Sequence, residues 1–171
     1  MAAPLFLFSL VGLGLFYFQN LLLLPQISLR LLGLLLFCVG LRPSFSLAFS
    51  LALVLGLLQD SFATTPFGLH LGTSLLVVAM ARFCQRRLLL PKVGPLIAAS
   101  LAALALQELG FLLILMVLGF QPFTFSDLVA FRGLELLATA ALAPLMYALV
   151  RGLEKLLGRY GWRPRHFWAQ E

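Results

Sequence analysis

The chain has 171 residues, of which 62% are hydrophobic and only 11% are charged, and its mean hydropathy is +1.06. A soluble domain is roughly 45–50% apolar and 25% charged, so this composition excludes an ordinary soluble domain and predicts one compact integral membrane protein. The net charge of +6 would favour nucleic acid in a soluble protein, but these basic residues cluster in short loops and in the tail, which is typical of membrane topology signals. We therefore expect the lipid bilayer as a partner and no nucleic acid.

Six apolar stretches follow one another along the chain, and we expect each to be a transmembrane helix. They cover about residues 4–24, 28–41, 44–60, 67–84, 93–120 and 126–150. In lipid only helices or closed barrels satisfy the backbone, and these stretches lack the alternation of a barrel strand. The sequence predicts an all-α integral membrane protein, a six-transmembrane-helix bundle over residues 1–150, followed by a basic cytoplasmic interfacial tail over 151–171.

Basic residues set the expected orientation of the bundle. They lie between the fourth and fifth stretches and after the sixth, so both of these segments should be cytoplasmic. Six spans place both termini in the cytoplasm and leave Arg30 as the one basic residue outside. The stretch 28–41 is short for a crossing, so five spans with a re-entrant segment also satisfy the charge rule. We favour six, because a continuously apolar segment that faces lipid needs a full crossing.

The third and fourth stretches carry small residues and one carboxylate. Four positions of the third stretch share one helix face, because they are spaced four residues apart: Ala48, Ala52, Gly56 and Asp60. After a turn at Pro66, Gly68 and Gly72 form a G-x-x-x-G pair that favours close helix packing. We expect a tight hairpin that presents surface to membrane partners. Alternatively, Asp60 caps free N–H groups at the start of the fourth helix, or simply reaches water.

A second group of polar residues lies within the expected membrane region. Glu108 is well inside the fifth stretch, where a carboxylate must face protein or water. Positions at related depths in the outer half of the bundle are His70, Gln107, Arg132 and Glu135. These residues could form an internal ion-pair network, a ligand cavity or an interface to another membrane helix.

Catalytic and metal-binding patterns are missing from the sequence. It contains no Ser/His/Asp set, no H-E-x-x-H spacing and no glycine-rich phosphate loop. Cys38 and Cys84 are not spaced as C-x-x-C and lie in or beside apolar runs, which favours packing over a disulfide or a metal. We expect neither an enzyme nor a cofactor or metal.

The segment GLLQDSFATTPFGLHLGTSLLVVAMARFCQRR resembles the central hairpin of the bacterial rod shape-determining MreD family. That family shows a G-x-x-x-D helix end, a short turn, a P-x-G or similar element, an apolar helix and then a basic loop. Gly56, Asp60, Pro66 and Gly68 stand at the matching positions, and Arg82, Arg86 and Arg87 supply the basic residues. More loosely, the resemblance extends over the whole chain, through Glu108 in a long fifth span and Pro144 in the last span.

The resemblance implies a multi-pass subunit of the bacterial cytoplasmic (inner) membrane with no enzymatic activity. Such a subunit belongs to the elongation complex that supports lateral peptidoglycan synthesis and cell shape. It implies binding to the single-pass membrane protein MreC, and indirectly to the MreB filament, the RodA glycan polymerase and its penicillin-binding transpeptidase. A substrate-binding S-component of an energy-coupling-factor vitamin transporter remains the alternative, because such proteins also have six helices and an outward polar pocket.

Overall fold

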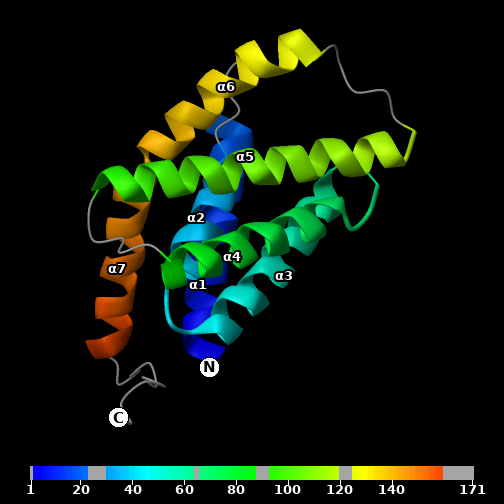
Figure 1. The fold of residues 1–171 in the computed structure, drawn as a ribbon. Helices are drawn as coiled ribbons and strands as arrows, with labels where there is room; N and C mark the ends of the chain where they lie inside the picture. Colours follow the sequence, from blue (N-terminus) through cyan, green and yellow to red (C-terminus); the bar gives the residue numbers. More distant parts are fainter. Residues whose placement is uncertain (1, 23–29, 64–65, 88–92, 120–124, 160–171) are drawn as a thin grey trace.

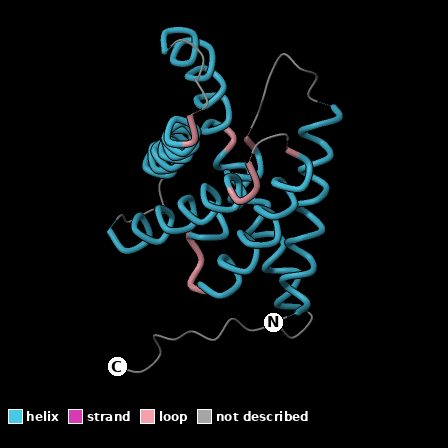
Figure 2. The backbone as a smooth tube through the Cα atoms, turned by 90° about the vertical axis from the view of Figure 1, so that its right-hand side faces the viewer, coloured by secondary structure: helices cyan, strands magenta, loops and turns pink. Residues whose placement is uncertain are grey.

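The computed structural model describes residues 2–22, 30–63, 66–87, 93–119 and 125–159, and every element in these ranges is a helix (Figures 1 and 2). The first helix, α1, continues as a short π-helical segment, η1. The elements are α1 Ala2–Tyr17, η1 Phe18–Leu22, α2 Leu31–Gly40, α3 Phe45–Phe62, α4 Leu69–Arg87, α5 Val93–Val117, α6 Phe125–Ala141 and α7 Ala143–Arg159. The all-α prediction is confirmed for the described residues.

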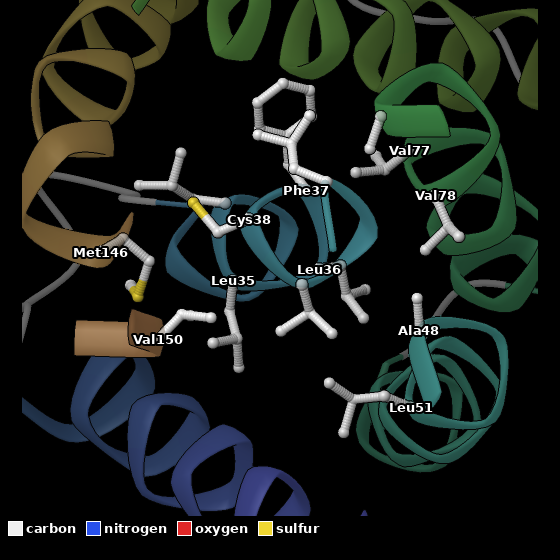
Figure 3. Packing of buried hydrophobic residues seen from close by; sticks show 14 of the residues in the cluster. Leu35, Leu36, Phe37, Cys38, Ala48, Leu51, Val77, Val78, Met146 and Val150 are labelled. Carbon is white, nitrogen blue, oxygen red and sulfur yellow. The ribbon is translucent and has the colours of Figure 1, made fainter. Parts of the chain in front are cut away.

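The short helix α2 lies at the centre of the molecule. All ten of its residues are buried, and it contacts α1, α3, α4, α5, α6 and α7. Figure 3 shows its side chains among residues of the surrounding helices: Leu35, Leu36, Phe37 and Cys38 of α2 lie near Ala48, Val77, Val78, Met146 and Val150. A helix that is apolar all round is one that protein surrounds. The expectation that this segment faces lipid is therefore wrong.

Several polar side chains are buried beside the apolar core, and many large apolar side chains are exposed. The buried polar residues are Asp60, Thr73, Ser74, Ser100, Gln107, Glu108 and Thr139. Many large hydrophobic side chains are exposed, among them Phe67, Met116, Val117 and Leu134. A soluble protein rarely exposes so much contiguous apolar surface, whereas lipid chains cover it at no cost. The arrangement supports a membrane location.

Two described helices, α3 and α5, are long and apolar enough to cross a membrane, and a third crossing results if α6 and α7 together form one bent span. At 1.5 Å per residue α2 extends roughly 15 Å, about half of a bilayer core. Among the described residues, length and composition thus give two or at most three candidate crossings, and the six-span bundle stays a prediction.

The last expected span, 126–150, is divided. The helices α6 and α7 meet at Leu142 with a bend of 41°. Pro144 explains the break, because it has no N–H to donate to the preceding turn and its ring crowds the carbonyl four residues earlier. α7 then continues to Arg159, so the expected boundary at residue 150 falls within one continuous helix.

Candidate functional site

The carboxylate of Asp60 caps the start of α4. Its Oδ1 accepts a hydrogen bond from the backbone amide of His70 at 2.8 Å. Its Oδ2 accepts from the amides of Gly68 at 3.0 Å and Leu71 at 3.2 Å. The first turn of a helix has no internal partners for these N–H groups, and a carboxylate there also opposes the positive end of the helix dipole. The capping alternative for Asp60 is thus confirmed, and its side chain is buried within the chain.

Glycines make this capped hairpin possible in two different ways. Gly68 has φ +95°, a conformation that side-chain-bearing residues rarely adopt. At Gly56 a Cβ atom would lie 2.7 Å from the Cα of Leu71, so the glycine allows α3 and α4 to approach closely. By contrast, a Cβ at Gly72 would meet no atom within 4 Å. The close packing expected from G-x-x-x-G is made by Gly56 instead of by Gly72, and Pro66 precedes the capped turn.

The small face of α3 is used inside the molecule. Ala48 and Ala52 are fully buried, like Gly56 and Asp60 on the same face. The neighbouring helix that this face contacts belongs to the same chain. A partner protein therefore has no access to these four residues in this conformation.

Glu108 forms a buried salt bridge with Arg30, which stands directly before α2. The Glu108 side chain is 7% exposed and that of Arg30 is 26% exposed. A buried carboxylate requires such a partner, because desolvation of an unpaired charge is costly. This bridge fastens the start of the central helix to α5.

Gln107 and His70 lie beside the same ion pair. At Gly33 of α2 a Cβ atom would lie 2.5 Å from the Gln107 side-chain oxygen, so the glycine leaves room for that amide. The backbone amide of His70 donates to Asp60, and the His70 ring packs on Phe111, one turn along α5 from Glu108, with centroids 5.5 Å apart. Residues of α3, α4 and α5 and the residue that precedes α2 thus form one polar cluster, which consists of Arg30, Asp60, His70, Gln107 and Glu108.

α6 reaches this polar cluster through a threonine. The Thr139 hydroxyl donates to the backbone carbonyl of Glu135 at 2.7 Å and accepts from the Arg30 amide at 3.3 Å. The backbones of Glu135 and Arg30 are therefore linked through the Thr139 hydroxyl. The side chain of Arg132 lies outside the described residues.

Sequence reasoning missed Arg30 as the partner of Glu108. One signal was available: Glu108 lies in the outer half, and Arg30 was the one basic residue assigned to the outer side. It also missed a second ion pair, at the end of the bundle where α2 ends. There Arg42 contacts Glu154 at 3.2 Å and its guanidinium lies 4.6 Å from the centre of the Tyr147 ring.

An apolar groove of about 360 Å³ lies between α1 and α3. Each helix contributes a stripe with the spacing i, i+3, i+4, i+7, which marks one continuous helix face. The stripes are Phe6, Ser9, Leu10 and Leu13 from α1, and Val54, Leu57, Leu58 and Ser61 from α3. Below them the helices pack closely, because a Cβ at Gly12 would contact Leu55.

Metal and thiol chemistry have no support in the described residues. No group of three His, Cys, Asp or Glu side chains in these ranges could hold a metal ion. Cys38 and Cys84 are both buried and free, as expected for packing residues. Within the polar cluster, Glu108 of α5 pairs with Arg30, and Asp60 of α3 accepts the amides at the start of α4.

Comparison with known proteins identifies the family. The family model described as rod shape-determining protein MreD matches residues 2–156, which include the capped hairpin, the polar cluster and the groove. No curated protein and no solved structure matches the chain. Because the match covers nearly the whole chain, the protein belongs to the MreD family of rod shape-determining membrane proteins.

Proposed function

We propose that this protein is a non-catalytic scaffold of the bacterial cell-wall elongation complex in the cytoplasmic membrane. It binds the single-pass protein MreC, and through MreC it connects the MreB filament with RodA and its transpeptidase partner. The observation that carries this proposal is the family match over residues 2–156. The buried polar cluster supports it, because a fixed arrangement of helices suits a protein that positions others.

We assign the α1–α3 groove to the transmembrane helix of MreC. Two apolar stripes with helical spacing run side by side for seven residues, a length of roughly 11 Å. An apolar helix fits into such a groove with its own stripe of side chains. Phe6 and Leu10 are 72% and 55% exposed, and Leu57 is 42% exposed, so these side chains are accessible from the membrane.

The small face of α3 is a poorer candidate for binding the MreC helix than the groove is. Gly56 and Asp60 already contact α4, so an external helix would have to displace α4 to reach them. The groove side of α3 needs no such rearrangement. Ser61 on this side also avoids a polar penalty, because its hydroxyl donates to the carbonyl of Leu57 at 2.8 Å.

A bulky substitution in the groove tests the assignment. In cells whose sole copy carries Leu57→Trp, we expect a severalfold loss of MreC recovered with the tagged protein, and rounded cells. The matched control is Leu113→Trp on α5, where the native side chain is 58% exposed and lies outside the groove. That variant should retain both MreC and the rod shape at equal protein level.

Three results would overturn the assignment. Equal recovery of MreC with Leu57→Trp and with the native protein would remove the groove as its binding face. A loss with Leu113→Trp alone would move the contact to α5. Crosslinking from the groove to a second copy of the chain, or to lipid alone, would identify a different occupant.

A further inference from the structure

Arg82 occupies an unusual position at the end of α4, near the start of α3. Its guanidinium donates to the backbone carbonyl of Pro43 at 3.1 Å and to the side-chain oxygen of Gln85 at 2.7 Å. It also lies 5.2 Å from the centre of the Phe45 ring. These contacts hold the guanidinium in place, but each of them is to a neutral group.

The positive charge of Arg82 is therefore not balanced by these contacts. Arg86 lies four residues further along α4, on the same helix face, so it adds a second positive charge beside Arg82. The Nε of Arg82 is buried and has no hydrogen-bond partner within the described chain. By contrast, Arg42 at the same end of the bundle forms a salt bridge with Glu154. Two neighbouring arginines of this kind are complementary to a phosphate group.

Exposed aromatic side chains lie next to the two arginines. On α3, Phe45 is 54% exposed and Phe49 is 39% exposed, and their rings pack 5.8 Å apart. On α4, Phe83 is 56% exposed. This exposed apolar surface begins at Phe45, which lies beside Arg82, and continues along α3 to Phe49, away from the end of the bundle. A free phosphate ion has no apolar surface to bury against these rings, whereas the acyl chain of a lipid can pack on them.

We propose that Arg82 and Arg86 bind the phosphate of an anionic phospholipid, whose acyl chain lies along Phe45 and Phe49. The expected orientation places this end of the bundle at the cytoplasmic leaflet, which carries anionic headgroups. Basic pockets between helices on that side are the usual places for specific headgroup contacts. The site is independent of the partner groove between α1 and α3, and it adds a lipid requirement to the scaffold.

The test uses the full-length protein in a neutral detergent, titrated with phosphatidylglycerol, phosphatidylcholine or inorganic phosphate. Native mass spectrometry measures bound lipid, and thermal unfolding measures stabilisation. We expect phosphatidylglycerol to bind and to raise the melting temperature, while the other two probes have little effect. Arg82→Gln should weaken phosphatidylglycerol binding by about tenfold, the loss of one charge-assisted contact.

Two variants control for charge and for folding. Arg151→Gln removes the same charge from an exposed position on α7 and should bind phosphatidylglycerol like the native protein. Arg86→Gln leaves the contact to Pro43 intact and should weaken binding even if Arg82→Gln fails to fold. Equal losses of phosphatidylglycerol binding in Arg86→Gln and Arg151→Gln would show that binding depends on general surface charge and not on this site. An equal response to phosphatidylcholine, or to inorganic phosphate, would also overturn the proposal.

Discussion

At the residue scale, two buried carboxylates stabilise the fold, because one accepts backbone hydrogen bonds and the other pairs with an arginine. Asp60 accepts three backbone N–H groups at the start of α4, and Glu108 is paired with Arg30. Both are buried in a protein whose exterior is apolar. Removing either one leaves unpaired donors or an unpaired charge inside the bundle.

Substitution of Asp60 should loosen the hairpin between α3 and α4. We expect Asp60→Ala to lower the free energy of unfolding by about 1–3 kcal/mol, because it removes a helix cap with charged acceptors. Asp60→Asn should cost less, because it keeps one acceptor oxygen. The measurement is thermal unfolding in detergent, with exchange of the His70 and Leu71 amides as the local readout. Unchanged exchange at those amides in Asp60→Ala would contradict the capping role.

The same variant also tests the role of the hairpin in cells. We expect Asp60→Ala to lose partner retention and rod shape, because the hairpin carries one wall of the α1–α3 groove. The neighbouring Gln59→Ala is the control, since Gln59 is neither among the groove residues nor the acceptor for the α4 amides. Rods that persist with normal partner recovery in Asp60→Ala would show that this part of the hairpin is dispensable.

The salt bridge between Arg30 and Glu108 predicts an order of stabilities. Glu108→Ala should lower stability in detergent more than Glu108→Gln, which keeps hydrogen-bonding capacity. The expected loss for Glu108→Ala is on the order of 2 kcal/mol, because Arg30 is partly exposed and retains some solvation. The double variant Arg30→Ala/Glu108→Ala should be more stable than the sum of the single losses implies. Strictly additive losses, or negligible losses in the single variants, would show that the salt bridge does not stabilise the fold.

At the element scale, glycines decide how closely α3 and α4 pack. Gly56→Ala places a methyl group 2.7 Å from the Cα of Leu71, and backbone cannot yield as a flexible side chain does. We expect a loss of about 1–3 kcal/mol from this overpacking. Gly72→Ala meets open space within a helix and should instead stabilise α4, by up to about 1 kcal/mol. The measurement is thermal unfolding of both variants in detergent. Stability changes of the same sign in the two variants would contradict this account of the packing.

The helices themselves could largely be predicted, because apolar stretches bounded by prolines mark helical segments directly. The ends of α3 and of α5 lie within a few residues of the expected limits. Pairing between helices could not be predicted in the same way. The sequence shows that Glu108 needs a partner, but the choice of Arg30 depends on α2 passing through the centre of the bundle. Even the position of α2 follows from its neighbours, since an apolar run looks the same whether lipid or protein surrounds it.

At the scale of the whole molecule, the choice between six and five spans stays a prediction, and the path of the chain gives a reason to expect six. Gly12 of α1 lies against Leu55, and Phe16 lies against Phe62 with ring centroids 5.3 Å apart. α1 and α3 therefore run in the same direction, as Figure 1 shows, and the segment that contains α2 must return the chain to the first side. We expect a reporter fused to the N-terminus to be cytoplasmic. A reporter on the outer side would support five spans.

The most direct test of the scaffold role is mass spectrometry of the proteins that co-purify with the tagged chain from gently solubilised native membranes. We expect a single-pass protein of the MreC type together with cell-wall polymerases. Recovery of paired ATPases with a coupling membrane subunit would contradict the scaffold role and make the polar cluster around Glu108 a ligand pocket.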